Sequence, residues 1–514
     1  MKRRTFLEQF GLVGGSTVAM TAMRSWDLMA QAGPRPVLSG RPNGTRVVVL
    51  GAGVSGLTVA YELTKLGYRV QILEARDRVG GVNWTLRRGS THTETGAGGE
   101  TQVCTFDEGQ YHNGGPWRLP HWHTGVLGYC KELGVPLEVF VNEGEASYFY
   151  YEGDNIGPLA NKRVRLREVK ADMLGYTSEL MAKVVDQNAL DMPLSAEDKE
   201  RFVTFLVTEG YLDSADRAYK KTTARGPGDP HDFRALLQSG FPNRLRSVIE
   251  GTGQAPMFQP VGGMDQFPKG FQRKLGDAIT FGAEIVSIRQ GENDVKVAYR
   301  NVKTGARTEV TADYCVSCLP LTILKDLDVN LAPETMAAVK ATPYSPSAKM
   351  GLQMKRRFWE EDDRIFGGHL YSNLPIGSFS YPSWGYFGAK GILLGFYGSG
   401  QTSGLIDKPI AARVEHVLTH ASKVHPQIRA EFESAYCTFW AKTPYSLGAF
   451  AGGGGGAGGG TGDRLATLGK PDHRIFLGCA AVSGNGGWQE GAVAAAWKQV
   501  KQLHERVMTT ARTA

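Results

Sequence analysis

A glycine-rich turn near the start of the chain holds the first residues whose types and spacing could do chemistry. It has the spacing GxGxxG and directly follows a β-branched run at 46–50. In such a turn the first glycine allows a tight bend, the second lets the backbone approach a pyrophosphate, and the third lets the next helix pack closely. The N-terminus of that helix offers free N–H groups to phosphates. We therefore expect a dinucleotide to bind at Gly51, Gly53, Val54, Ser55 and Gly56.

An acidic residue follows these glycines at the distance that a dinucleotide site requires. The apolar run 69–73 ends at Glu74, roughly 20 positions after the turn. Its carboxylate can accept hydrogen bonds from a ribose diol and would repel a 2′-phosphate, which argues against an NADP-type ligand. The alternative is a glycine-rich turn without a ligand. The residues expected to continue the binding surface are Ala75, Arg76, Gly80 and Gly81.

The elements that must position these residues alternate between helical and strand periodicity, which is typical of an α/β fold. Because a nucleotide turn lies near one end of the chain and a strand, loop and helix near the other, we expect one discontinuous domain with segments inserted in it. The pattern predicts helices at 57–66, 123–133 and 489–507, and a helical region over 162–245. It predicts strands at 46–50, 69–73, 284–288, 295–299, 308–312, 352–354, 392–397 and 475–478, of which those between 284 and 312 form an antiparallel meander.

The composition is that of an enzyme-sized globular protein. With 514 residues and a net charge of +7, the chain can hold two or three domains and is mildly basic. It has no basic tract with interleaved aromatic residues, so we expect no nucleic-acid partner. Its 11 histidines lack the spacing of metal ligands, so we expect no metal. Cys315 and Cys318 form a CxxC pair in a strand-like run, and we expect both thiols to be small buried hydrophobes.

The first 40 residues have the pattern of a targeting segment. The pair Arg3 and Arg4 precedes a weakly apolar stretch at about 11–23 and an AxA site at 30–32. Twin arginines of this kind predict a Tat-type export signal over 1–40, and therefore an exported protein. The apolar stretch is too short to span a bilayer stably. The alternative is the basic N-terminus of a cytoplasmic protein.

Five stretches resemble the flavin-containing amine oxidase superfamily, and within it the L-amino acid oxidases of snake venoms and bacteria. The most specific is Gly-Pro-Trp-Arg-Leu-Pro at 115–120, because it is similar to the segment where L-amino acid oxidases hold the substrate carboxylate. A planar guanidinium can grip a carboxylate through two charge-assisted hydrogen bonds. The five stretches are 49–81, 115–120, 261–265, 347–349 with 357–362, and 487–492.

The resemblance implies an α/β protein with a Rossmann-like FAD-binding domain, a substrate-binding domain with a mixed sheet, and a helical insertion. These domains would follow the targeting segment and interleave along the chain. The implied segments are 45–90, 262–345 and 465–514 for the FAD-binding domain, 91–160 and 346–450 for the substrate-binding domain, and 161–258 for the helical domain.

The resemblance also implies roles for individual residues. Arg118 and Tyr381 would bind the substrate carboxylate. Gly487 and Trp488 would lie beside the flavin ring and help to form the substrate site, where the Trp488 side chain would be part of the cavity wall. Lys349 would hold a water near flavin N5. The alternatives are a surface ion pair for Arg118, core packing for Tyr381 and Trp488, and a solvated position for Lys349. The residues implied to contact FAD beyond the turn are Gly115, Pro116, Trp117, Arg118, Ile285, Val286, Trp488, Gln489 and Ala492.

The implied activity is that of an FAD-dependent L-amino acid oxidase with non-covalently bound FAD. A hydride would pass from the substrate Cα to flavin N5, the imino acid would hydrolyse to a 2-oxo acid and ammonia, and O₂ would become H₂O₂. Members of this family often dimerise, so a homodimer is one expectation. The alternatives are an amine or polyamine oxidase, a tryptophan-monooxygenase-like enzyme, and a flavin-poor, non-catalytic relative.

Three departures from the family's pattern motivate the last of these alternatives. Val82 stands where the family has an arginine that reaches the cofactor. Cys479 stands where the family has an acid, and a run of glycines fills 452–460 in place of a more ordered segment. Each lost side chain could remove a hydrogen bond to a charged group, worth about 1.5–3 kcal/mol.

Overall fold

The computed structural model describes residues 33–42, 44–96, 98–187, 195–248, 256–398, 403–452 and 462–513. The expected export signal, with its twin arginines and its cleavage site, lies outside these residues, as does most of the glycine run 452–460. Among the helices that are described, none combines the length and the apolar character needed to cross a membrane.

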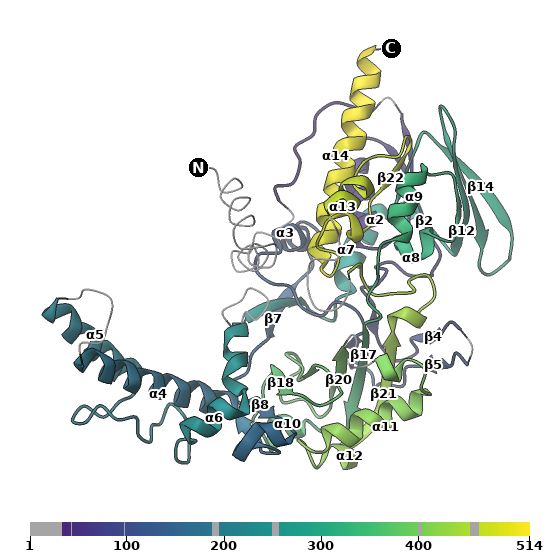
Figure 1. Ribbon diagram of the computed structural model, residues 1–514. Helices are drawn as coiled ribbons and strands as arrows, with labels where there is room; N and C mark the ends of the chain where they lie inside the picture. Colours follow the sequence, from purple (N-terminus) through teal and green to yellow (C-terminus); the bar gives the residue numbers. More distant parts are fainter. Residues whose placement is uncertain are drawn as a thin grey trace.

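A five-stranded parallel sheet carries the glycine-rich turn (Figure 1). Its central strand β1 (Arg46–Leu50) pairs with β2 (Arg69–Glu74) on one side and with β15 (Tyr314–Ser317) on the other. β1 is an unbroken apolar run because both of its faces are covered. Helix α2 (Val54–Leu66) makes the crossover from β1 to β2. The outer strands are β11 (Ile279–Phe281) beside β2 and β22 (Ile475–Leu477) beside β15.

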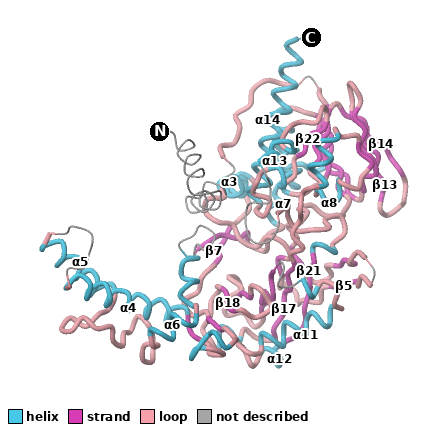
Figure 2. Tube along the Cα trace, viewed as in Figure 1, coloured by secondary structure: helices cyan, strands magenta, loops and turns pink. Residues whose placement is uncertain are grey.

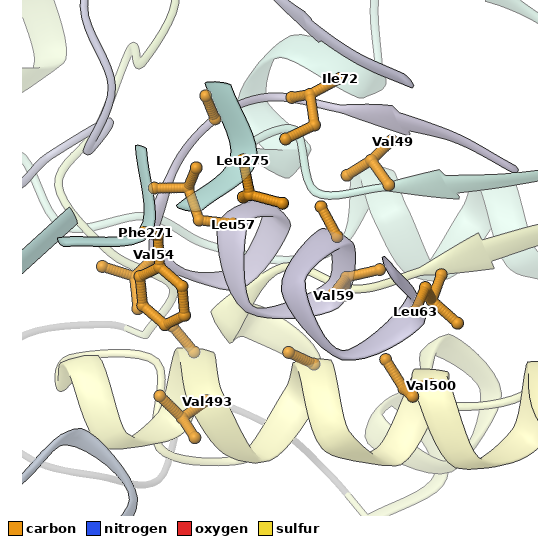
Figure 3. Packing of buried hydrophobic residues seen from close by; sticks show 14 of the residues in the cluster. Val49, Val54, Leu57, Val59, Leu63, Ile72, Phe271, Leu275, Val493 and Val500 are labelled. Carbon is orange, nitrogen blue, oxygen red and sulfur yellow. The ribbon is translucent and has the colours of Figure 1, made fainter. Parts of the chain in front are cut away.

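Two helices from distant parts of the chain pack against α2. They are α7 (Gln266–Leu275) and the last helix, α14 (Gln489–Thr513). Figure 3 shows Val59 and Leu63 of α2 between the sheet and Val493 and Val500 of α14, and all four side chains are buried. Full burial of an aliphatic side chain of this size stabilises a fold by about 1.5–3 kcal/mol. This layer therefore fixes the end of the chain against the glycine-rich turn.

A second sheet is the antiparallel meander that the sequence predicts. Its strands are β12 (Ala283–Gln290), β13 (Val295–Asn301) and β14 (Arg307–Ala312), and the short strand β16 (Asp328–Val329) lies parallel to β12. The inward side chains of this meander join a buried apolar cluster with β1 and β22. The two sheets therefore form one packed unit.

A seven-stranded mixed sheet forms the other half of the molecule. Strand β17 (Ala348–Met354) is buried along its whole length between β20 (Gly391–Gly398) and β21 (Phe432–Phe439), and it is antiparallel to both. Strand β18 (His369–Ser372) instead runs parallel to β8 (Tyr148–Tyr150), which makes the sheet mixed. The sheet is completed by β19 (Phe379–Ser380) and β9 (Val164–Arg165).

Helices α4 (Leu166–Asp186), α5 (Ala196–Glu209) and α6 (Phe233–Ser239) form the helical insertion. Figures 1 and 2 show α4 and α5 extending away from both sheets. A buried ion pair ties the connection after α5 to α4, because Nε of Arg225 donates to Asp172 at 2.8 Å. The chain is thus α/β, with a Rossmann-like sheet, a mixed sheet and a helical insertion, as the sequence predicts. The domain boundaries stay a prediction.

Shorter elements connect these layers. The strands are β3 (Thr85–Leu86), β4 (Thr91–Thr93), β5 (Thr101–Val103), β6 (His112–Asn113), β7 (Leu137–Val141) and β10 (Pro256–Pro260). The helices are α3 (Thr124–Glu132), α8 (Leu321–Leu324), α9 (Pro333–Lys340), α10 (Phe358–Glu361), α11 (Ile410–Ala421), α12 (Ile428–Glu431) and α13 (Gly462–Leu468).

Candidate active site

A cavity of about 1010 Å³ extends from the glycine-rich turn to the mixed sheet. This volume lies at the upper end of typical ligand pockets, which measure roughly 300–1,000 Å³. Segments from both ends and from the middle of the chain line it together. The expected site residues that line the cavity are Gly51, Gly53, Val54, Ser55, Glu74, Ala75, Arg76, Gly80, Gly81, Gly115, Pro116, Trp117, Arg118, Ile285, Lys349, Gly487, Trp488, Gln489 and Ala492.

Three expected site residues, Gly56, Val286 and Tyr381, do not line this cavity. Gly56 has the packing role that the sequence predicts for the third glycine, because a Cβ there would lie 1.9 Å from the carbonyl oxygen of Gly51. Val286 lies beside a separate small pocket on the meander. Tyr381 is buried in the core of the mixed sheet, and its hydroxyl lies 2.8 Å from Nε2 of His425. That partner holds the hydroxyl away from any ligand in the cavity.

The dinucleotide end of the cavity is built from bare backbone and one buried acid. Gly53 caps the N-terminus of α2, and a Cβ added there would meet nothing within 4 Å. Glu74 accepts the backbone N–H groups of Ala52 at 2.7 Å and Arg76 at 2.9 Å. A carboxylate has lone pairs for further donors, so Glu74 can still receive a ribose hydroxyl. These residues fit a dinucleotide with its phosphates at the helix N-terminus.

The positions that depart from the family's pattern also lie in the cavity wall. Val82 and Cys479 both line it with uncharged side chains. Beside Val82, the Asn83 side chain receives a hydrogen bond from Nε2 of Gln489 at 2.8 Å, while its own buried Nδ2 donates to no described group. A buried donor without a partner is rare in proteins. Asn83 therefore offers a hydrogen bond to a ligand close to where the arginine is missing.

The CxxC pair only partly matches its prediction. Cys315 is fully buried, but Cys318 is partly exposed and lines the cavity. Burial raises the pKa of the Cys318 thiol to about 12, so it stays protonated and behaves as a weakly polar wall residue.

Arg118 is one of several charged residues in the part of the cavity next to the mixed sheet, which we call the substrate end after the expected role of Arg118. Its Nη1 donates to Oδ1 of Asn142 at 2.5 Å and lies 3.2 Å from Nε2 of His369, and its buried Nε has no hydrogen-bond partner. Within the described part of the chain, no carboxylate pairs with this guanidinium. Burial lowers the pKa of Arg118, which measures the cost of holding the charge there. An anionic ligand would offset that cost.

Lys349 faces the same end of the cavity from β17. Its ammonium donates to the carbonyl of Gly115 and lies 4.7 Å from the ring centroids of both Trp117 and Tyr397. Burial, and after it the charge of Arg118, lowers the pKa of Lys349 well below its ordinary value. This side chain therefore gives up its proton more easily than a surface lysine does.

Several residues of the substrate end were not predicted from the sequence. Tyr397 meets Lys349 because the two are direct partners in the β17–β20 pairing. Asn142 follows β7, and His369 begins β18, where burial and the charge of Arg118 lower its pKa to about 3. No motif marks these positions, and only the strand pairing could have located them. The missed residues are Asn142, Glu143, Arg244, His369, Tyr371 and Tyr397.

Trp488 forms part of the cavity wall where α14 begins. The ring of His123 packs edge-on against it, with centroids 4.9 Å apart. Glu490, a buried acid two residues after Trp488, accepts hydrogen bonds from the backbone N–H groups of Gly125 at 2.8 Å and Val126 at 2.9 Å. A carboxylate at a helix N-terminus is favourable, so Glu490 fastens the start of α14 to α3 and fixes the position of Trp488.

Comparisons with known proteins agree with this geometry. The sequence model of flavin-containing amine oxidoreductases matches residues 54–504. This chain is 26% identical to YobN of Bacillus subtilis (strain 168) over 478 residues, which cover 89% of this chain and 94% of YobN. It is 26% identical to the L-amino-acid oxidase of Pseudechis australis over 472 residues, which cover 88% and 85% of the two chains. The solved structure of wild-type putrescine oxidase bound to putrescine has the same fold, with a TM-score of 0.57, 18% identity, and coverage of 90% of this chain and 99% of that chain.

Proposed function

Because the chain belongs to the flavin-containing amine oxidoreductase family, we propose that it is an oxidase of L-amino acids with non-covalently bound FAD. The observation that carries the substrate class is Arg118, a half-buried guanidinium in the cavity wall without a carboxylate partner among the described residues. An amino acid brings that carboxylate, whereas a simple amine does not. The named activity of the snake-venom relative supports the same substrate class.

The residues of the dinucleotide end would hold the adenine nucleotide and flavin parts of the cofactor. Glu74 would receive the ribose, the backbone at Gly53 and Gly81 would face the pyrophosphate, and Asn83 would donate the hydrogen bond that Val82 cannot. A bound flavin supplies hydride acceptance and the passage of electrons to O₂.

The chain's own contribution is orientation and control of charge. Arg118 would hold the substrate carboxylate, and Tyr397 replaces Tyr381 as the tyrosine placed to assist. Fixing the carboxylate restricts the position of Cα, which lowers the entropic part of the barrier. The positive charge of Arg118 also disfavours a second cation nearby, so it favours the neutral form of the substrate amine and of Lys349. Lys349 would hold one water through its remaining N–H groups.

The test compares two arginines that line the same cavity. Arg118→Met removes the half-buried guanidinium, and Arg244→Met removes an exposed one. We expect Arg118→Met to raise KM for L-leucine by at least about tenfold, since hydrogen bonds between charged groups are worth about 1.5–3 kcal/mol. Arg244→Met should change KM less than threefold or so, because its charge is screened by solvent. The measurement is H₂O₂ release by the flavin-loaded enzyme.

Three results would contradict the proposal. An unchanged KM in Arg118→Met would remove the carboxylate role. Oxidation of putrescine without oxidation of any L-amino acid would replace the proposed substrate class by amines. Release of CO₂ in place of a free 2-oxo acid would indicate monooxygenase-like chemistry.

Export and assembly are separate proposals. We propose that the twin-arginine segment directs export, and that the protein forms a homodimer. Cell fractionation with Arg3→Lys and Arg4→Lys together tests the first, and light scattering on the purified protein tests the second.

A further inference from the structure

Glu143 is a buried acid in the substrate half of the cavity. It follows Asn142, the residue that holds Arg118, and both line the cavity wall. The side chain of Glu143 is only 3% exposed, and its Oε1 meets the ammonium of Lys170 at 3.4 Å without hydrogen-bond geometry. A buried carboxylate is costly unless it is fully paired, so its place in a cavity wall points to a ligand that supplies a further donor.

The cations near Glu143 do not neutralise it fully. The ammonium of Lys170 lies 3.4 Å from Oε1 of Glu143, but it lies closer, at 2.7 Å, to Glu145 at the surface. Arg244 lines the cavity but is exposed, and its Nε donates to the hydroxyl of Tyr151 at 3.2 Å. Solvent screens both cations more than it screens the buried acid.

The other acids of the cavity are already occupied. Of the three carboxylates that line it in the described part of the chain, Glu74 holds the glycine-rich turn through backbone N–H groups. Glu284 lies at the dinucleotide end and forms an ion pair with Arg300. Glu143 is therefore the cavity acid that remains for a substrate.

We propose that Glu143 selects L-amino acids with a basic side chain, such as L-lysine or L-arginine. With the substrate carboxylate on Arg118, the ammonium or guanidinium of the side chain would lie against Glu143. This inference rests on the proposed function, because it uses Arg118 as the carboxylate site. A site built around a buried charged group discriminates strongly against an analogue that lacks the matching group, because the buried group is then left unpaired.

L-Lysine and L-norleucine provide a direct comparison, because they differ chiefly at the terminal ammonium. Their dissociation constants are measured by calorimetry without O₂ on the wild type, Glu143→Gln and the matched control Glu145→Gln, each loaded with flavin that was reduced beforehand and so cannot accept a hydride. We expect the wild type to bind L-lysine at least about tenfold more tightly than L-norleucine. Glu143→Gln should reduce this ratio to within about twofold, while Glu145→Gln should leave it unchanged because Glu145 lies outside the cavity wall.

Three results would overturn the inference. The first is equal binding of the two ligands by the wild type, which needs no variant to fold. The second is an equal loss for both ligands in Glu143→Gln, which would place Glu143 at the substrate's α-ammonium. The third is a change of the binding ratio in Glu145→Gln equal to that in Glu143→Gln, which would indicate a general electrostatic effect of surface charge.

Turnover separates this inference from the proposed function. If the flavin-loaded wild type oxidises neither L-lysine nor L-norleucine, the proposed function fails, but the binding ratio still decides the role of Glu143. If it oxidises both with equal kcat/KM and binds both equally, the proposed function stands and the selectivity fails.

Discussion

Lys349 illustrates how a single buried group balances opposing interactions. The carbonyl of Gly115 and the faces of two aromatic rings favour its charged form, each contributing modestly. Loss of hydration and the nearby guanidinium of Arg118 oppose it, and these effects dominate, since the pKa of Lys349 is well below the ordinary value. Lys349 therefore makes an unfavourable contribution to the free energy of folding of the wild type, and this contribution depends on pH.

We predict that Lys349→Met raises Tm relative to the wild type more at pH 7 than at pH 10. Because burial lowers the folded-state pKa of Lys349, the unfolded chain binds more protons between that pKa and 10.5. Wild-type stability therefore rises with pH over this range, and methionine does not titrate. Thermal unfolding at the two pH values measures the difference. Lys355→Met is the control, because exposed Lys355 also donates to a carbonyl, that of Ala430, and its effect should not vary in this way.

At the scale of elements, the separation along the chain between contacting residues decides which site residues can be predicted from the sequence. The glycine-rich turn depends on β1, α2 and β2, which are neighbours along the chain, so its residues were predictable. The tyrosine beside Lys349 depends instead on the register between β17 and β20, which shifts between Met350 and Gly351. The resemblance to the oxidase family pointed to Tyr381, and the sequence could not correct this because it does not supply that register. Asn142 and His369 were missed for the same reason.

Helix packing at the turn gives a prediction for two helical glycines. Gly56→Ala should lower the free energy of unfolding by about 1–3 kcal/mol, because the new Cβ would meet the carbonyl oxygen of Gly51 at 1.9 Å. Gly128→Ala in α3 should raise it by about 0.5–1 kcal/mol, because nothing lies within 4 Å and alanine favours a helix. Urea unfolding of both variants and of the wild type measures the two changes in the free energy of unfolding. Equal effects would show that α2 does not need the close approach.

At the scale of the whole molecule, buried histidines set the response to acid. His112 and His123 are buried and His369 is half-buried, and loss of hydration lowers the pKa of each to about 3. Since their unfolded values lie near 6.5, the unfolded chain takes up protons first as the pH falls. Their contribution is therefore neutral above pH 6.5 and destabilising below it.

We predict that the free energy of unfolding falls by about 1.4 kcal/mol per buried histidine for each pH unit below 6.5. His123→Gln should make the slope between pH 6 and 4.5 shallower by that amount, because neither ring nitrogen of His123 has a hydrogen-bond partner to lose. Chemical unfolding at several pH values measures the slope. Exposed His473→Gln should leave it unchanged, and an equal change in both variants would contradict this account.

The order of strands in the parallel sheet has a consequence for synthesis. The central strand β1 leaves the ribosome early, whereas the edge strand β22 and the helix that covers α2 leave almost last. At ~5–20 residues per second, the early strands wait some tens of seconds for these neighbours. Until then β15 is an outer strand, and its uncovered edge can pair with another chain. The cavity is therefore complete only after these late elements are made, and a nascent chain stopped before β22 would have neither the fifth strand of the sheet nor the tryptophan wall of the cavity.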